Sequence, residues 1–403
     1  MATHIKTDLL VIGAGSGGLS IAAGASQLGL DVTLLEGGEM GGDCLNSGCV
    51  PSKALLRASK AAHEVRHTAK FGVNGHEPAV DFPAVKGHVR KVIDTIAPMD
   101  SVERFEGLGV RVITEYGRFT GKQRVETDGH RIDAKKIVIA TGSRAAVPPI
   151  PGLDTVPYLT NETLFQQMER PEHLIIIGAG PIGIEMAQAH RRLGSQVTVL
   201  DLGPMMPKDD PELVDVLRQN LRREEVNIRE HIKIARVEPN GNGVAVILDQ
   251  DGAEERIEGT DLLVAAGRQP NVEKLNLEAA AVKYDRRGVT VDQRLRTSNS
   301  KIYAVGDVAG GPQFTHVAGY HAGIIIKNLA FKIPAKVDYT ALPWVTYADP
   351  ELAHVGMTEE QAREEFGPNG YEITRWSFHE NDRAQAEAKI DGLVKVILVK
   401  GRV

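Results

Sequence analysis

The sequence predicts an α/β protein with two doubly wound parallel-sheet domains, followed by the start of an α+β domain. Three observations predict this fold: an unusually high glycine content, an internal repeat offset by 165 residues, and a change of pattern from about residue 336. The chain has 403 residues, of which 42 are glycine. Without a collagen-like period, such an excess indicates glycine-rich turns. A chain of this length predicts about two to three domains.

Composition and charge exclude several classes of protein. The net charge is −6 without long runs of one sign, which argues against a general binder of nucleic acids or anionic membranes. The apolar stretches are too short to span a bilayer, and we find no pattern of a signal peptide. Only two cysteines occur, so a disulfide-stabilised secreted protein is excluded and a cytoplasmic protein is favoured.

The internal repeat relates residues 8–36 to residues 173–201. Each copy reads as an apolar run, the pattern G-x-G-x-x-G, a helix-like stretch, a second apolar run and an acidic residue. The key positions are Gly13, Gly15, Gly18 and Glu36 in the first copy, and Gly178, Gly180, Gly183 and Asp201 in the second. This order is typical of a βαβ unit that binds a dinucleotide.

Each position in the pattern has a physical role. The first glycine allows a tight turn, the second lets the backbone approach a pyrophosphate, and the third lets the helix pack on the strand. The helix N-terminus offers N–H groups to the phosphates, and the acid can accept hydrogen bonds from a ribose. A single G-x-G-x-x-G could be only a glycine-rich turn. Two complete copies predict two bound dinucleotides.

The remaining chain predicts further elements around the two copies. We expect helices near residues 52–67 and 82–107. Strands are expected at 110–113, 137–140, 244–248, 262–265, 302–305, 344–347 and 393–399. A proline-rich joint at 147–152 is a plausible domain boundary.

The two cysteines, Cys44 and Cys49, lie in the segment GGDCLNSGCVPSK just beyond Glu36. In a regular helix their spacing separates the Cα atoms by about 8–9 Å, too far for a disulfide. They can bridge only if the segment is irregular, and Gly48 supplies conformational freedom. Pro51 suits a first helical turn, which places Cys49 near a helix N-terminus that favours the thiolate. We interpret the pair as a redox dithiol; the alternative is two buried, inert thiols.

These motifs together closely resemble the flavoprotein disulfide reductases, a family that includes dihydrolipoamide dehydrogenase, glutathione reductase and mercuric reductase. The resemblance rests on the cysteine segment, the duplicated fingerprint, ATGS (140–143), GRQPN (267–271) and AVGD (304–307), and it covers essentially the whole chain. It implies FAD at the first fingerprint and NAD(P)H at the second. The domains implied are residues 1–150 (FAD, first part), 151–270 (NAD(P)), 271–335 (FAD, second part) and 336–403 (an incomplete dimerisation domain).

The resemblance also implies roles for individual residues. Cys44 matches the thiol that exchanges with substrate, and Cys49 matches the thiol beside the flavin. Lys53 and Glu185 match a charged pair near flavin and nicotinamide, although alone they could be ordinary helix charges. Residues expected at the FAD site are Gly13, Gly15, Gly18, Glu36, Gly42, Lys53, Thr141, Gly142, Gly306 and Asp307. Residues expected at the nicotinamide-dinucleotide site are Gly178, Gly180, Gly183, Asp201 and Gly267.

The sequence departs from the family near its end. The family uses a His-x4-Glu pair near the C-terminus as acid–base catalyst, acting across a dimer, and this chain ends before that region. His354 and Glu359 have the same spacing but match the opening of the interface domain, so we assign them no catalytic role. Asp307 could be a simple helix cap. We interpret His316 and His321 as packing or flavin-contacting residues, and we expect no metal site.

We therefore expect an enzyme that transfers two electrons between NAD(H) and a disulfide or dithiol substrate, with NADP(H) less favoured. A dihydrolipoamide dehydrogenase-like activity is the first choice. The alternatives are a mercuric-ion or quinone reductase on the same core, or a flavin redox sensor with little turnover. The expected partner is a second copy of the chain, if the native chain has a complete interface domain.

Overall fold

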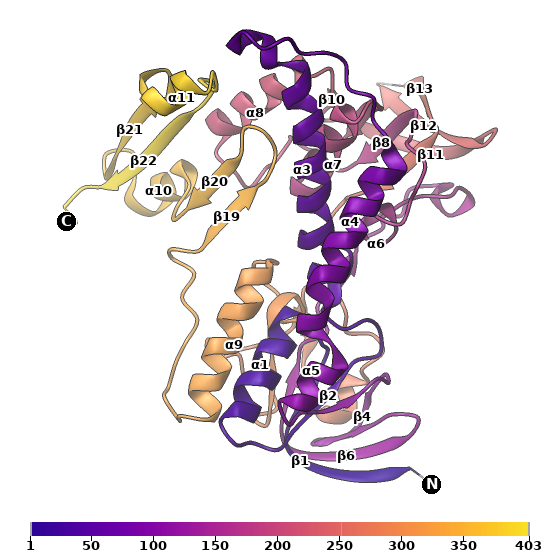
Figure 1. Ribbon diagram of the computed structural model, residues 1–403. Coiled ribbons are helices and arrows are strands. Elements are labelled where there is room, and N and C mark those ends of the chain that lie inside the picture. The colour runs from indigo at the N-terminus through magenta and orange to yellow at the C-terminus, as the bar shows by residue number, and fades with distance from the viewer. Residues whose placement is uncertain (1, 251, 402–403) are drawn as a thin grey trace. The chain divides into compact units, whose positions relative to one another are not determined.

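The two copies of the repeat form two parallel sheets, one in each of the two units into which the computed structural model divides (Figure 1). The structure describes residues 2–250 and 252–401. The first unit comprises Met1–Pro51, His88–Ala146 and Arg268–Val337, and the second comprises Ser52–Gly87, Val147–Gly267 and Asp338–Val403. This division by contacts groups residues 52–87 with the second unit. The four functional domains remain a prediction.

The sheet of the first unit has seven strands in the order β3-β2-β1-β6-β5-β4, with β18 also paired to β6. Its strands are β1 (Thr3–Ile12), β2 (Val32–Leu35), β3 (Arg111–Ile113), β4 (Arg118–Gly121), β5 (Arg124–Glu126), β6 (His130–Ile139) and β18 (Ile302–Ala304). The β1, β2, β3, β6 and β18 pairings are parallel, whereas β4 and β5 pair antiparallel. The carboxyl ends of β1, β6 and β18 therefore meet at one edge.

Helices cover this sheet and close two buried clusters. They are α1 (Ser16–Gln27), α2 (Gly42–Asn46), α5 (Val102–Gly107) and α9 (Thr315–Leu329). The indigo α1 and the orange α9 lie side by side (Figure 1), and a Cβ added to Gly17 would lie 3.3 Å from the Cβ of Ala318. The core contains Leu9, Val11 and Val138 on one face and Leu10 and Ile139 on the other. The near-continuous apolar strands reflect a sheet buried on both faces.

The second unit repeats the parallel arrangement with four strands in the order β10-β9-β8-β14. They are β8 (His173–Ile177), β9 (Gln196–Leu200), β10 (Asn227–Arg229) and β14 (Asp261–Val264). Helices of this unit include α6 (Asn161–Leu164), α7 (Pro181–Arg192) and α8 (Pro211–Arg223). Both α7 and α8 begin with proline, which suits the first helical turn.

A three-stranded antiparallel sheet packs on the parallel sheet of the second unit. It consists of β11 (Lys233–Asn240), β12 (Gly243–Gln250) and β13 (Ala253–Gly259). Val244, Val246 and Leu248 of β12 share a buried cluster with Ile177 and Leu200 of the parallel sheet. Only β12 was expected from the sequence. Charged residues interrupt the apolar residues of β11 and β13, so neither strand contains a continuous apolar run.

The C-terminal part contains two antiparallel hairpins and two short helices. The elements are β19 (Pro343–Thr346), β20 (Leu352–Val355), α10 (Glu359–Phe366), β21 (Tyr371–Ser377), α11 (Asp382–Ala386) and β22 (Leu393–Val399). The short elements β7 (Ser143–Ala145) and β15 (Arg268–Pro270) pair in the first unit, as do β16 (Tyr284–Asp285) and β17 (Gly288–Val289). The short 3-10 helices are Thr68–Phe71, Ala97–Asp100, Leu153–Thr155, Leu277–Ala280, Gly306–Ala309 and Phe378–Glu380.

Two long helices run close to the sequence prediction, with one correction. The first is α3 (Cys49–Arg66), which begins three residues earlier than expected. The helix expected over 82–107 is instead α4 (Phe82–Ile96), a 3-10 turn and α5. Pro98 lies in that turn, and the Ser101 hydroxyl accepts from the Arg104 N–H to start α5. Of the described helices, none is long and apolar enough to span a membrane.

Candidate functional site

The first glycine-rich turn connects β1 to α1. Gly13 has φ +108°, and a Cβ there would collide with the carbonyl oxygen of Ala140 at the end of β6. A Cβ on Gly18 would collide with the carbonyl oxygen of Gly13. Protein packing therefore requires both residues to be glycine. Gly15 differs, because no atom of the described residues lies within 4 Å of a Cβ built on it.

The second turn, between β8 and α7, has the same geometry. Gly178 has φ +115° and would collide with the carbonyl oxygen of Ala265, while Gly183 would collide with that of Gly178. Gly180 again faces open space among the described residues. In both copies, contacts within the protein require glycine at the first and third positions of the pattern. They do not require it at the second position.

The acid that ends each repeat closes its own turn. Glu36 accepts the N–H of Ala14 at 2.6 Å and that of Gly38 at 2.7 Å. Asp201 accepts the N–H of Ala179 at 2.6 Å and that of Gly203 at 2.8 Å. The sequence pattern did not reveal this bracing. Each carboxylate oxygen has further acceptor capacity, so a ribose contact stays compatible and remains a prediction.

These turns fit the dinucleotides that the sequence predicts. Gly15 and Gly180 are the N-cap residues of helices of 12 residues each, and neither cap has a side-chain hydrogen bond. The first-turn N–H groups and the positive end of the helix dipole suit a pyrophosphate above the open glycine. The backbone of Gly42, with φ +59°, packs closely against the first turn, because a Cβ there would lie 2.7 Å from the Cα of Gly15.

The dithiol segment folds as two helices rather than one. Cys44 lies in α2 and is partly buried, whereas Cys49 is the first residue of α3 and is exposed. The left-handed residues here are Gly41 and Gly42. Gly48 lies in the irregular break between the two helices, where its φ is not left-handed but a Cβ would lie 2.8 Å from the carbonyl oxygen of Asp43. Glycine is required for this close approach.

The thiols of Cys44 and Cys49 are in hydrogen-bonding contact. The hydrogen bond with Cys49, followed by burial, raises the pKa of the Cys44 thiol well above its usual range. Hydrogen bonds from Thr315 and Ser16, the first residues of α9 and α1, oppose this shift. The Thr315 hydroxyl also lies 3.3 Å from the Cys49 sulfur.

Asp307 and Asp43 are joined through one arginine. Arg268 lies 3.2 Å from the Asp43 carboxylate and 3.5 Å from that of Asp307, and its Nε donates to the Ser143 hydroxyl at 2.7 Å. Ser143 donates to Asp307 at 2.5 Å. Burial raises the pKa of Asp307, although Ser143 and Arg268 oppose the shift. Asp307 lies in a 3-10 turn after Gly306, which has φ +68°. Neither Asp43 nor Arg268 was expected at the site.

The segments ATGS and GRQPN come together beside this network. Thr141 donates its hydroxyl to the Asn271 carbonyl at 2.8 Å, and the Asn271 side chain donates to the Thr141 carbonyl at 2.9 Å. Gly142 and Gly267 have φ +64° and +121°, so both turns need glycine. Thr141 thus holds two loops together, whereas the cofactor contacts expected of these residues remain predictions.

Lys53 and Glu185 form the charged pair that the family pattern predicts. The Lys53 ammonium donates to Glu185 at 3.2 Å and lies 4.3 Å from the ring centroid of Tyr347. Glu185 is only 5% exposed and also accepts the backbone N–H of Tyr347 at 2.9 Å. Such a buried carboxylate, held by a charge and an N–H donor, is not an ordinary helix charge. Tyr347 was not foreseen.

The histidines that follow Asp307, and His354, make packing and hydrogen-bonding contacts within the protein. His321 is fully buried and accepts the Gly306 N–H at 3.1 Å, and burial lowers its pKa to about 4. His316 stacks on Phe314. His354 stacks on Trp344, whereas Glu359 binds Lys395 at 2.7 Å, so these two do not form an acid–base pair. Within residues 2–250 and 252–401, no cluster of three potential metal ligands occurs.

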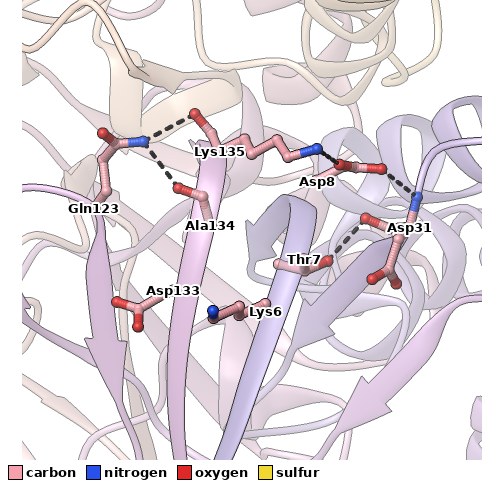
Figure 2. Close-up of a pocket in the computed structure, with 8 residues that line it drawn as sticks. All are labelled: Lys6, Thr7, Asp8, Asp31, Gln123, Asp133, Ala134 and Lys135. Carbon is pink, nitrogen blue, oxygen red and sulfur yellow. Dashed lines mark hydrogen bonds and ion pairs between the residues drawn. The ribbon is translucent and has the colours of Figure 1, made fainter.

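A separate hollow of about 510 Å³ lies on the first unit, away from the glycine-rich turn (Figure 2). It is lined by Lys6, Thr7, Asp8, Asp31, Gln123, Asp133, Ala134 and Lys135. Figure 2 shows Lys135 paired with Asp8, at 2.6 Å, and Thr7 bonded to the Asp31 carbonyl. The hollow contains none of the predicted site residues.

Comparisons with known proteins agree with this geometry. A sequence profile described as "Pyridine nucleotide-disulphide oxidoreductase" matches residues 7–322, and a profile of that family's dimerisation domain matches residues 342–403. The chain is 35% identical to a mercuric reductase of Staphylococcus aureus over 91% of its own length. It spans 66% of that relative, just under two thirds.

Two further proteins are similar over most of their length. A dihydrolipoyl dehydrogenase of Thermus scotoductus is 36% identical, over 97% of this chain and 84% of the relative. The solved structure of a Cu(II) complex of RclA, a HOCl-induced flavoprotein disulfide reductase from Escherichia coli, superposes with a TM-score of 0.87. It is 28% identical and covers 98% of this chain and 87% of that one.

Proposed function

Because the chain belongs to the pyridine nucleotide-disulphide oxidoreductase family, we propose that it is an FAD-dependent enzyme that moves two electrons between a nicotinamide dinucleotide and a disulfide or dithiol. The observation that carries this proposal is the contact between the thiols of Cys44, in α2, and Cys49, the exposed first residue of α3. Two thiols in contact, one of them exposed at a helix N-terminus, are suited to thiol–disulfide exchange.

The residues proposed to hold the cofactors come from the two turns. The first turn, with Gly15, Glu36 and Gly42, holds the adenosine-diphosphate half of FAD, and Asp307 contacts its ribityl chain. The second turn, with Gly180 and Asp201, holds the nicotinamide dinucleotide. FAD held at the first turn would supply a carrier of two electrons between the nicotinamide and the dithiol. Lys53 and Glu185 provide a fixed charge pair for that exchange.

The dithiol reduces a substrate disulfide in two successive thiol–disulfide exchanges. The Cys44 sulfur, after losing its proton, attacks one sulfur of the substrate disulfide, and the other substrate sulfur leaves as a thiolate and takes up a proton. The Cys49 thiolate then attacks the Cys44 sulfur, forms the Cys44–Cys49 disulfide and releases the second substrate thiol, which also takes up a proton. Return of the Cys44–Cys49 disulfide to the dithiol would take two electrons and two protons, of which the hydride of NADH supplies both electrons and one proton and solvent supplies the other. With a dithiol substrate, all steps run in reverse.

For the substrate, we propose a lipoamide-type disulfide or dithiol with NAD(H) as the nicotinamide partner. The similarity to a dihydrolipoyl dehydrogenase over 97% of the chain supports this choice. A second candidate is reduction of a metal ion, which the similarity to mercuric reductases favours. Both candidate reactions use the same dithiol. They differ in the substrate that reacts with Cys44, which is a disulfide in the first and a metal ion in the second.

The test is a panel of acceptors and donors with the purified, FAD-loaded protein. We expect lipoamide-dependent oxidation of NADH and dihydrolipoamide-dependent reduction of NAD, both abolished by Cys44→Ser. Oxidation of NADH that depends on Hg²⁺, without turnover of lipoamide, would favour the metal-ion candidate. Flavin reduction by NADH without turnover of any acceptor would contradict an enzyme of this kind and favour a redox sensor.

We also propose a homodimer, because residues 342–403 match the family's dimerisation domain. The hairpin of β21 and β22 in this segment carries exposed apolar side chains at Trp376, Val394 and Leu398. Sedimentation equilibrium of the full chain should give twice the monomer mass of 43.6 kDa. A monomer at all concentrations would contradict this proposal for this form of the chain.

A further inference from the structure

The loop that follows β19 is fixed to helix α7 by its backbone. Strand β19 packs on α7, and the N–H of Tyr347, the next residue, donates to the Glu185 carboxylate at 2.9 Å. Two residues later, the N–H of Asp349 donates to the Gln188 side-chain oxygen at 2.7 Å, and the Gln188 amide donates to the Asp349 carbonyl at 2.8 Å. Glu185 and Gln188 are three positions apart and therefore lie on one face of the helix. All of these residues belong to the second unit.

An ion pair anchors the same loop at a third point. The Asp349 carboxylate lies 3.1 Å from Arg192, whose side chain is only 4% exposed. Arg192 also donates to both oxygens of Glu224, each at 2.7 Å. Breaking a buried pair of this kind would leave an uncompensated charge. The loop is therefore fixed by contacts within the protein, before any ligand binds.

The ring of Tyr347 restrains Lys53. The ring centroid lies 4.3 Å from the Lys53 ammonium. The same ammonium donates to Glu185 at 3.2 Å and to the Ser52 hydroxyl at 3.3 Å. A lysine carries its charge on a flexible four-carbon stem, and this side chain is 38% exposed, so two long hydrogen bonds leave it room to turn toward solvent. The aromatic face attracts the cation and opposes that movement.

We propose that Tyr347 is a positioning residue for the electron transfer: its ring holds the Lys53 ammonium beside Glu185, so that the charge is in place before the nicotinamide and the flavin react. This inference rests on the proposed function, which assigns the Lys53–Glu185 pair to the exchange between the two cofactors. A charge that is fixed in advance costs no reorganisation at the moment of reaction, whereas a mobile charge must first be ordered. Tyr347 acts through Lys53 and needs its ring for this role, while its hydroxyl is not required.

The test measures flavin reduction by NADH in stopped flow with the FAD-loaded protein. Tyr347→Leu removes the ring but keeps the backbone N–H to Glu185. It should lower the limiting rate by about twofold to fivefold, the range expected for a cation–π contact to a partly exposed lysine. The Kd for NADH should not change, because the ring acts on Lys53 and not on the nucleotide. Tyr347→Phe keeps the ring and should retain the rate of the unmodified protein.

Phe71→Leu is the matched control. Phe71 also lies beneath a lysine of the second unit, since the Lys70 Nζ is 5.1 Å from its ring centroid. It follows the C-terminal end of α3, whereas Lys53 lies in the first turns of that helix. Phe71→Leu therefore removes an equivalent contact far along the helix, and the rate should not change.

Two further measurements separate an effect through Lys53 from a general structural one. Lys53→Met should lower the rate, and Tyr347→Leu should cause no further loss in that background, because the lysine on which the ring acts is gone. Labelling of Lys53 by an N-hydroxysuccinimide ester, quantified by mass spectrometry, needs neither bound FAD nor turnover. Tyr347→Leu should increase this labelling by about twofold to fivefold, whereas Tyr347→Phe and Phe71→Leu should leave it unchanged.

The outcomes distinguish this inference from the proposed function. If NADH does not reduce the flavin of the unmodified protein, the proposed function fails and the role of Tyr347 fails with it. If NADH reduces the flavin but Tyr347→Leu matches Phe71→Leu in rate and in labelling, only the role of Tyr347 is refuted. An equal loss of rate in the Lys53→Met background refutes it as well, since the effect would not pass through Lys53. An equal loss in Tyr347→Phe also refutes it, since the ring would not be the cause. If Tyr347→Leu does not fold, Tyr347→Met takes its place, and an unchanged rate there would overturn the proposal.

Discussion

Replacing Asp201 with asparagine should narrow the preference for NADH over NADPH. The carboxylate accepts two backbone N–H groups, at 2.6 and 2.8 Å, which fixes it at the turn where we place the ribose. Its charge strengthens the contact with two ribose hydroxyls and repels a 2′-phosphate. Together these effects amount to about 2–3 kcal/mol, or about 30- to 150-fold in relative efficiency. Asparagine removes the charge but keeps one acceptor for the turn.

The structure also shows why alanine is the poorer substitution. Asp201→Ala would leave two backbone N–H groups without their acceptor, at a cost of about 1–3 kcal/mol for each buried group. Both nucleotides would then bind a loosened turn, so efficiency should fall with NADH as well. Asparagine separates the charge effect from this loss.

The assay is stopped-flow reduction of the flavin by NADH and NADPH at low and high salt. Because the repulsion is electrostatic, the NADPH rate of the unmodified protein should rise with salt relative to the NADH rate. A preference of the unmodified protein for NADPH would refute the ribose role of Asp201. An unchanged ratio in Asp201→Asn would refute it equally, while leaving the FAD and dithiol proposals intact.

The remaining predictions concern the cofactor, the dithiol and a buried lysine. Gly15→Val should abolish retention of FAD while leaving the fold intact, because a side chain there meets open space; a yellow variant would contradict the placement. Cys49→Ser should remove the long-wavelength absorbance of the reduced protein, whereas Cys44→Ser should keep it and lose disulfide reduction; the opposite pattern would exchange their roles. Burial lowers the pKa of Lys86 to about 8, below the usual 10.5, so the charged amine destabilises the fold below pH 8 and this cost disappears above pH 10.5. Lys86→Met should therefore raise the free energy of unfolding, measured by denaturant titration, by at most about 3 kcal/mol at pH 7 and by less at pH 10; a difference from the unmodified protein that does not shrink as the pH rises refutes this.

Local patterns in the sequence were enough to predict the turns. The close approach of Gly18 to the Gly13 carbonyl, and of Gly183 to the Gly178 carbonyl, lies within one βαβ unit, so spacing alone identifies it. Cys49 could likewise be placed at a helix start, because Pro51 follows within the first turn. Each of these features arises from residues close together in the chain.

Contacts between distant segments could not be predicted in this way. Arg268 joins Asp43 to Asp307 across more than 200 residues of sequence, and Tyr347 reaches Glu185 from a hairpin 162 residues away. The antiparallel strands beside β12 were missed because charged residues interrupt the apolar residues of both strands.

The acid at the end of each repeat closes its own turn and is also proposed to bind a ribose, and a sequence pattern cannot distinguish these two roles. Glu36 and Asp201 make the same pair of backbone hydrogen bonds, although we assign them different cofactors. The acid is therefore required to close the turn before any ligand binds, and its presence alone is a weak indicator of NAD. The effect of the Asp201 charge on the choice between NAD and NADP must therefore be tested apart from its role in closing the turn. Asp201→Asn does this, because the amide removes the charge and keeps one acceptor for the backbone N–H groups.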